Sequence, residues 1–175
     1  MTGQTHLYCG LATAGVITVT TGFLGVHHTD IPTFIGYLVG VSFGAILPDV
    51  DQPKSKVNNI FPFNIISFTL RHIGRIKHRG LTHSLLFLLC LIIITALTLV
   101  TGIPILIGFC CGMVIGDMTH LFLDCLNEKG CQLFFPLPQK IHIASIKYNG
   151  FIEHSMRLCG FAICCIAIIF SVLYR

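Results

Sequence analysis

The stretch from Leu85 to Val100, LLFLLCLIIITALTLV, runs for sixteen residues without a formal charge. About 20 apolar helical residues cross the roughly 30 Å hydrocarbon core of a bilayer, so a run of this kind favours a membrane helix. Only 10% of the 175 residues are charged, whereas soluble domains carry about 25%. The sequence therefore predicts an all-α integral membrane protein.

Five stretches come near the length of a membrane span: 7–26, 32–47, 83–101, 103–126 and 151–173. We expect a bundle of about five transmembrane or membrane-embedded helices, in one domain over residues 1–175. The connection 48–82 is too long for a simple turn. Its apolar segment FPFNIISFTL is too short to span a bilayer, which predicts a polar, re-entrant loop at about 48–82.

The distribution of Lys and Arg predicts the orientation. The connections 48–82 and 127–150 carry nine of these cations, whereas the turns HHTDIP and TGIP carry none. The positive-inside rule assigns basic loops to the cytoplasm, so we expect a multi-pass membrane protein with its N-terminus in the cytoplasm. The cations form no basic helix face, so a nucleic-acid partner is not expected.

Nine cysteines do not form a disulfide pattern, because they include two adjacent pairs in apolar segments and no CxxC motif. Free cysteine behaves as a small hydrophobic residue, so we interpret these side chains as reduced and structural. Cys125 and Cys131 flank a loop beside the polar motifs described next, and we retain them as the one pair of candidate ligands among the cysteines.

His and carboxylate side chains gather at the ends of five segments that share one predicted membrane face. In the fourth segment, the spacing of Asp117, His120 and Asp124 (i, i+3, i+7) places all three on one face of a helix. Intramembrane acidic groups are costly and usually have a partner. The complete set is His6, Asp49, Asp51, His78, His83, Asp117, His120, Asp124, Glu153 and His154.

Histidine together with carboxylate suits Zn²⁺, Mn²⁺ or Fe²⁺. Taken singly, LPDVD also fits a helix stop with solvated aspartates, and HRGLTHS also fits an anchor on lipid headgroups. GDMTHLFLD is harder to explain without partners, because three ionisable groups lie on one face of an apolar helix. The agreement between segments therefore favours a metal site at the cytoplasmic face.

In this order, an N-terminal His, LPDVDQPKS, HRGLTHS and GDMTHLFLDCLNEKGCQLFFPLP resemble the YdjM-like family of LexA-binding, inner-membrane-associated, metal-dependent hydrolases. The resemblance covers most of the chain, from His6 to about Pro138, and Glu153 matches the acidic residue of the last helix. It implies an integral protein of the bacterial inner membrane with the site of a metal-dependent hydrolase, similar in ligand pattern to the all-helical zinc-dependent phospholipase C and nuclease class. Association with LexA is implied by the family name alone. The metal ligands implied are His6, Asp49, Asp51, His78, His83, His120 and Asp124.

Seven ligands exceed what one tetrahedral zinc ion uses, so we expect two ions that share a bridging carboxylate, a geometry suited to phosphoester hydrolysis. Zn²⁺ is the expected metal, with Mn²⁺ or Fe²⁺ as alternatives. Arg79 is the candidate phosphate holder, Glu153 is the candidate general base or additional ligand, and Thr82 or Ser84 would donate a hydrogen bond to a ligand. A site at the membrane surface favours a lipid or lipid-linked phosphoester as substrate.

Two other classes of function remain open. Asp117, His120 and Asp124 also fit a proton or metal-ion path, although the opposite half of the predicted spans offers only apolar, Gly or Thr residues. A non-catalytic membrane scaffold, in which the metal only joins the helices, is the other alternative. Whether Asp117 is a ligand or a partner of His120 stays open at this level.

Overall fold

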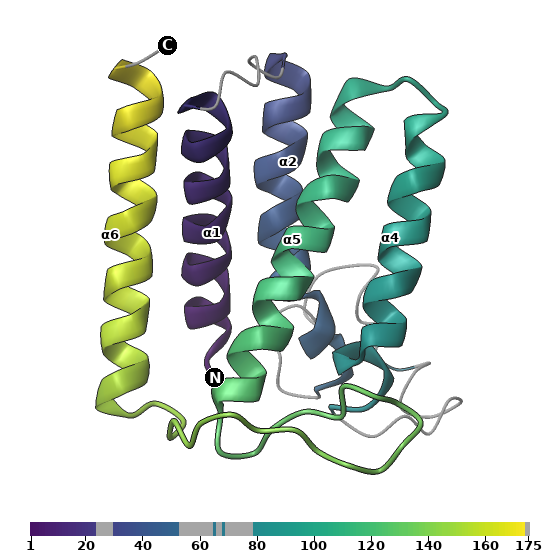
Figure 1. Ribbon diagram of the computed structural model, residues 1–175, viewed down its shortest axis with the longest axis vertical. Helices are drawn as coiled ribbons and strands as arrows, with labels where there is room; N and C mark the ends of the chain where they lie inside the picture. Colours follow the sequence, from purple (N-terminus) through teal and green to yellow (C-terminus); the bar gives the residue numbers. More distant parts are fainter. Residues whose placement is uncertain (24–29, 53–64, 66–67, 69–78, 174–175) are drawn as a thin grey trace.

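The computed structural model describes residues 1–23, 30–52, 65, 68 and 79–173. In these residues the chain forms five α-helices and two short 3-10 helices, and it contains no strand. The α-helices are α1 (Gly3–Phe23), α2 (Ile31–Gly44), α4 (Leu85–Leu99), α5 (Pro104–Leu126) and α6 (Phe151–Leu173), and the short ones are η1 (Leu47–Asp51) and η3 (Leu81–His83). The all-α bundle expected from the sequence is confirmed (Figure 1).

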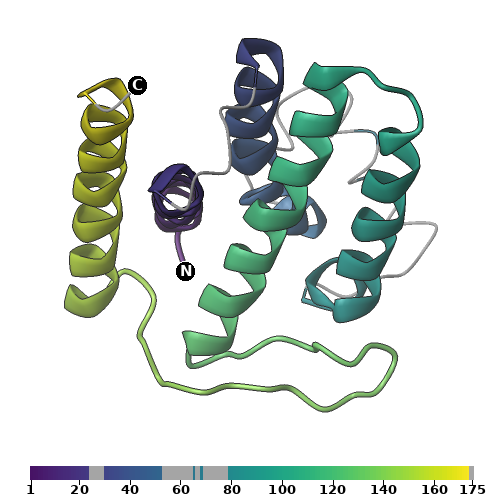
Figure 2. The ribbon, with the colours of Figure 1, turned by 45° about the horizontal axis from the view of Figure 1, so that its top comes forward.

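The five helices run side by side, and successive helices along the chain alternate in direction, so that α1 and α6 run parallel to each other, as do α2 and α5 (Figures 1 and 2). Helix α5 contacts α1, α2 and α4, and α1 also packs against α6 and α2. Helix α5 and the Phe151–Phe170 part of α6 are long and apolar enough to cross a membrane, and α2 and α4 are shorter apolar helices. The re-entrant segment expected within 48–82 lies mostly outside the described residues.

Local capping explains where several helices begin. The carboxylate of Asp30 accepts hydrogen bonds from the backbone N–H and the hydroxyl of Thr33, 3.2 and 2.6 Å away, at the start of α2. The Ser84 hydroxyl accepts from the backbone N–H of Phe87 at 3.3 Å and so caps α4. Helix α5 begins with Pro104, whose missing N–H costs nothing in the first turn.

Helices α2 and α5 cross in very close contact through glycines. A Cβ on Gly40 would overlap the carbonyl oxygen of Phe109, and a Cβ on Gly112 would overlap that of Tyr37. Small residues of this kind let helix backbones approach closely in lipid. The seam is formed by Gly36, Gly40 and Gly44 on α2 and Gly108, Gly112 and Gly116 on α5.

The outer faces of the bundle are apolar. On α4, Leu89, Ile93 and Leu97 are each at least half exposed, and Phe161 on α6 is 53% exposed. Apolar surface this extensive is unusual on a soluble monomer, but hydrocarbon would cover it at no cost. Hydroxyl groups on α1, such as those of Thr13 and Thr18, donate to backbone carbonyls four residues earlier. The helix therefore carries these hydroxyls without leaving them unpaired.

Candidate metal centre

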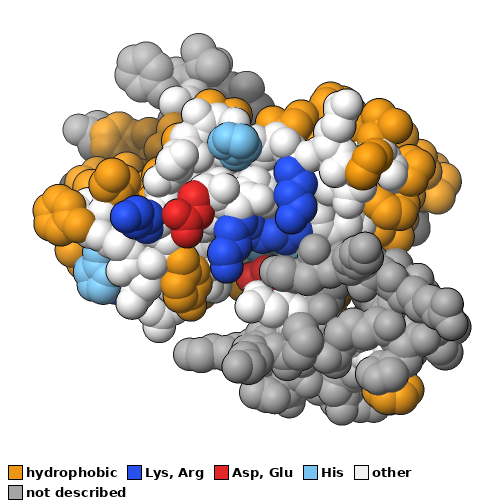
Figure 3. Space-filling model, turned by 90° about the horizontal axis from the view of Figure 1, so that it is seen from below, with side chains coloured by type: hydrophobic (Ala, Val, Ile, Leu, Met, Phe, Trp, Pro, Cys, Tyr) orange, Lys and Arg blue, Asp and Glu red, His pale blue; other side chains and the backbone are white. Residues whose placement is uncertain are grey.

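The helix ends that carry the polar motifs meet at one end of the bundle. The start of α1, the end of α2 with η1, η3 before α4, the end of α5 and the start of α6 all lie at the bottom of Figure 1. This end also carries Lys and Arg side chains near its middle when the molecule is viewed from below (Figure 3). The exposed Lys129, Lys140 and Lys147 belong to the connection between α5 and α6, which runs beneath the bundle.

Three buried histidines form the centre of this region, and none is more than 1% exposed. The His120 Nδ1–H donates to the carbonyl oxygen of Ala45 at 2.7 Å, which leaves the Nε2 lone pair directed away from that carbonyl. The Nε2 atoms of His120 and His83 are 3.3 Å apart. The ring of His6 stacks on that of His120 with 3.8 Å between centroids. A histidine that binds a metal through one ring nitrogen is typically oriented by a hydrogen bond that its other ring N–H donates. The bond from His120 Nδ1–H to Ala45 is of this kind.

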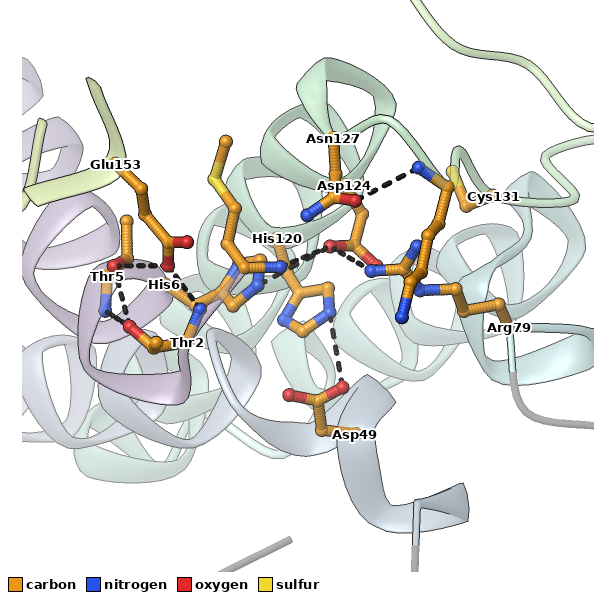
Figure 4. Close-up of polar contacts among 12 residues, drawn as sticks. Thr2, Thr5, His6, Asp49, Arg79, His120, Asp124, Asn127, Cys131 and Glu153 are labelled. Atoms are coloured by element: carbon orange, nitrogen blue, oxygen red, sulfur yellow. Dashed lines mark hydrogen bonds and ion pairs between the residues drawn. The ribbon is translucent and has the colours of Figure 1, made fainter. Parts of the chain in front are cut away.

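Two aspartates complete the cluster (Figure 4). Asp124 Oδ1 lies 3.5 Å from His6 Nε2, and Asp124 Oδ2 lies 3.5 Å from His83 Nε2. Asp49 Oδ1 lies 3.7 Å from His83 Nε2 and 4.0 Å from His120 Nε2. The two oxygens of Asp124 thus face different histidines, as a bridging carboxylate requires.

The donor atoms fit a divalent cation. They form two sets, His6–Asp49–His120 and His83–His120–Asp124, within each of which all ligand atoms lie within 4.8 Å of one another. A tetrahedral ion with metal–ligand bonds of about 2.0 Å separates its ligands by roughly 3.3 Å. The distances from His83 Nε2 to His120 Nε2 and to Asp124 Oδ2, 3.3 and 3.5 Å, are close to this ligand–ligand separation.

Asp49 is the most accessible of these ligand candidates, with 15% of its side chain exposed. Burial opposes its ionisation, but the hydrogen bond from His83 and the charges of His120 and His6 outweigh that effect and hold the pKa of Asp49 well below its usual range. Asp49 is therefore a carboxylate at neutral pH, which is the form that binds metal.

Arg79 contacts a candidate ligand directly. Its Nη2 lies 3.1 Å from Asp124 Oδ1 and 3.0 Å from Oδ2, and Nη1 donates to the carbonyl of Gly130 at 3.0 Å. The residue adopts a left-handed backbone conformation with φ of 65°, which is uncommon outside glycine and is found more often at functional sites. The sequence predicts Arg79 as a phosphate holder, and the structure pairs it with Asp124.

Glu153 belongs to neither ligand set. Its carboxylate accepts hydrogen bonds from the backbone N–H of Thr2, from the Thr5 hydroxyl at 3.0 Å and from the backbone N–H of Asn149 at 2.6 Å. These contacts join the first turn of α6 to the first turn of α1, which carries His6. Glu153, which the sequence predicts as a general base or ligand, therefore holds the start of α1 against α6.

Replacing Glu153 with Gln is expected to destabilise the protein by about 1–3 kcal/mol, because an amide cannot accept hydrogen bonds on both sides and leaves a buried donor unpaired. Thermal unfolding in detergent measures the loss, with the exposed Glu128→Gln as the matched control. Metal content should stay unchanged. Loss of metal at unchanged stability would instead identify Glu153 as a ligand.

Two of the seven predicted ligands cannot be placed. The backbone of Asp51 ends η1, but its side chain lies outside the described residues, as does all of His78. The other five, His6, Asp49, His83, His120 and Asp124, lie together as described above. The predicted hydrogen bond from the HRGLTHS motif corresponds to Thr82 Oγ1, which is 3.1 Å from His83 Nδ1.

Two features of the site had no sequence signal. The carbonyl of Ala45 orients His120, but any residue could supply a carbonyl. Thr5 binds Glu153, although the two residues are far apart in the chain. The cysteine pair that the sequence retains as candidate ligands, Cys125 and Cys131, is buried with its sulfur atoms 3.4 Å apart, but neither ligand set includes it. A hydrogen bond to Cys125 and burial raise the pKa of the Cys131 thiol.

Comparison with known proteins identifies the family. The sequence model of a family described as YdjM inner membrane protein matches residues 1–175. The chain belongs to the YdjM inner membrane protein family. Membership supports an inner-membrane location for this YdjM-family protein. No solved structure matches the chain.

Two curated relatives show how far the similarity extends. The uncharacterized protein YvsG of Bacillus subtilis is 30% identical over 160 residues, which are 91% of this chain and 89% of YvsG. The inner membrane protein YdjM of Escherichia coli is 35% identical over 92 residues, which are 52% of this chain and 44% of the relative. The match thus spans less than half the length of the Escherichia coli protein.

Proposed function

We propose that this YdjM-family protein is a metal-dependent hydrolase that acts on a phosphoester of a lipid or lipid-linked compound at the cytoplasmic face of the inner membrane. The observation that carries the proposal is the convergence of three buried histidines and two aspartates on one small volume. The ring nitrogens and carboxylate oxygens in it have the separations of a metal centre.

The ligand arrangement supports a site for two divalent ions, with Zn²⁺ as the expected metal and Mn²⁺ or Fe²⁺ as alternatives. Asp124 would bridge them, because one of its oxygens faces His6 and the other faces His83. His120 would serve one ion only, since its Nδ1 is engaged by Ala45. Asp51 and His78 are the candidates for the remaining positions.

Divalent ions at such sites polarise the phosphoester and lower the pKa of a water molecule toward about 7. The protein's own groups orient the reactants. The ion pair with Arg79 holds Asp124 in position. Arg79 is the more accessible of the two, with 11% of its side chain exposed against 1% for Asp124. A phosphate that approaches Asp124 from outside would therefore meet the Arg79 guanidinium, which suits phosphate oxygens.

A groove beside the site supports a lipid substrate. It lies between the start of α4, the second half of α5 and the following loop, with a volume of about 230 Å³. It reaches Cys125, the neighbour of Asp124 in the chain. The lining is apolar and consists of Leu85, Leu88, Met118, Leu121, Phe122, Cys125, Leu133 and Ile143.

Metal analysis with an activity screen tests the proposal. The purified protein is expected to contain near-stoichiometric Zn²⁺ or Mn²⁺ and to hydrolyse at least one member of a panel of phospholipids and lipid-linked phosphates. The double variant His83→Ala/His120→Ala should lose both properties, whereas the exposed His142→Ala should keep them. Full metal retention in the double variant would refute the metal site.

The second candidate function is a metal-stabilised scaffold without catalysis. It is favoured by one observation, which is that the two ligand sets draw on α1, η1, η3 and α5. An ion bound there would join four segments of the bundle. Unfolding after metal removal, combined with inactivity of the metal-loaded protein on the whole panel, would favour the scaffold over the hydrolase.

A further inference from the structure

Asp117 is a buried carboxylate that neither ligand set uses. It lies on α5 about 4.5 Å along the helix axis from His120, on the same helical face. Its side chain is 0% exposed, and neither carboxylate oxygen has a hydrogen-bond partner among the described residues. Acidic groups at such positions are expensive and call for a compensating charge.

Among the described residues, the histidine cluster is one source of this compensating charge. The charge of Asp117 interacts with His83, a member of one ligand set. On the side of α2, the neighbouring Gly116 packs against the backbone of Val41 and Ala45, which leaves little room for a long cationic side chain. A cation held by the ligand sets would lie on the side of α5 that Asp117 shares with His120.

Counting charges gives Asp117 a role. Asp49 and Asp124 supply two negative charges to the cluster, and Arg79 and the buried terminal ammonium of Met1, 3.4 Å from Asp124 Oδ1, supply two positive charges. A divalent cation would therefore leave an excess of positive charge, which an ionised Asp117 reduces. In a buried region this balance matters, because uncompensated charge is strongly unfavourable there.

We propose that Asp117 is the counter-charge of the metal centre: it stabilises the first divalent cation through space and raises its affinity without coordinating it. The inference rests on the metal site of the proposed function, but it does not depend on catalysis. Asp117 thus acts on the ion through its charge and does not touch it. Outer partners of metal sites typically contribute about 10- to 100-fold in affinity.

Titration with Co²⁺, whose visible absorption reports ligand binding, tests this role. The metal-free protein in detergent is compared with Asp117→Asn, which removes the charge at constant shape, and with Asp117→Leu, which removes all polarity. Both variants are expected to bind Co²⁺ about 10- to 100-fold more weakly. The control Asp30→Asn makes the same change at the opposite end of the bundle and should leave the affinity unchanged.

The melting temperature of the metal-free protein separates this role from a structural one. Because the carboxylate has no hydrogen-bond partner among the described residues, the metal-free variants should melt no lower than the wild type, and Asp117→Leu should melt higher. Affinities within twofold of wild type in both variants would overturn the proposal, and so would a lower metal-free melting temperature in both.

The outcome is distinguishable from failure of the hydrolase proposal. Weaker Co²⁺ binding in the Asp117 variants, together with inactivity on every phosphoester of the panel, would leave the counter-charge standing and remove the hydrolase. Absence of Co²⁺ binding by the wild type would overturn both.

Discussion

Replacing Asp124 with Asn is expected to abolish metal binding and to destabilise the metal-free protein by about 3 kcal/mol. Asp124 faces His6 and His83 and is paired with Arg79, so its carboxylate joins three separate parts of the cluster. As a ligand, it should affect affinity by more than the roughly 100-fold that outer partners contribute. The amide would also leave Arg79 without its carboxylate, and breaking such a buried pair is costly.

Elemental analysis of the purified variant measures the first effect, and thermal unfolding in detergent after chelation measures the second. Asp30→Asn is a suitable control, because Asn also caps helices and Asp30 lies at the other end of α2. A variant of Asp124 that retains wild-type metal content would show that the carboxylate is not a ligand. The bridging role would then have to be abandoned.

Replacing Gly112 with Ala is expected to cost about 3 kcal/mol or more, at the upper end of the range for overpacked cores. The new methyl group would overlap the carbonyl oxygen of Tyr37, and a helix backbone cannot move aside as a side chain can. Helices α2 and α5 would have to separate along the glycine seam. Because Ala45 and His120 lie on these two helix segments, metal affinity should fall with the stability.

Gly22→Ala provides the matched comparison for the seam. It lies in α1, and a Cβ there has no neighbour within 4 Å. Alanine is preferred over glycine in helices by about 0.5–1 kcal/mol, so this variant should unfold at a slightly higher temperature. If Gly112→Ala behaved in the same way, the close crossing of α2 and α5 would be contradicted.

The helices were predictable because their signals are local. Each of the five apolar stretches became a helix, and the expected start at 103 and end at 126 lie within one residue of α5 (Pro104–Leu126). The shared face of Asp117, His120 and Asp124 was predictable for the same reason, since it depends only on helical periodicity. The sequence contained no sign that α2 would meet α5.

Partners across the bundle were not predictable. Arg79 could have pointed at any anion near the surface, and its pairing with Asp124 depends on how the loop after α5 places the carbonyl of Gly130. Glu153 is equally suited by chemistry to bind a metal or to accept backbone hydrogen bonds. Only the packing of α6 on α1 brings it to Thr2 and Thr5. Such choices are made by tertiary contacts, which a single sequence does not encode locally.

The distribution of the ligands along the chain has a consequence for biosynthesis. His6 is made long before His120, near the end of α5, which both ligand sets require. A nascent chain therefore completes neither of these two sets until α5 has been made and has docked against α2. Captured metal would accordingly mark a chain in which these helices have assembled, and chains that stall before α5 would reach cellular proteolysis without an ion in either set.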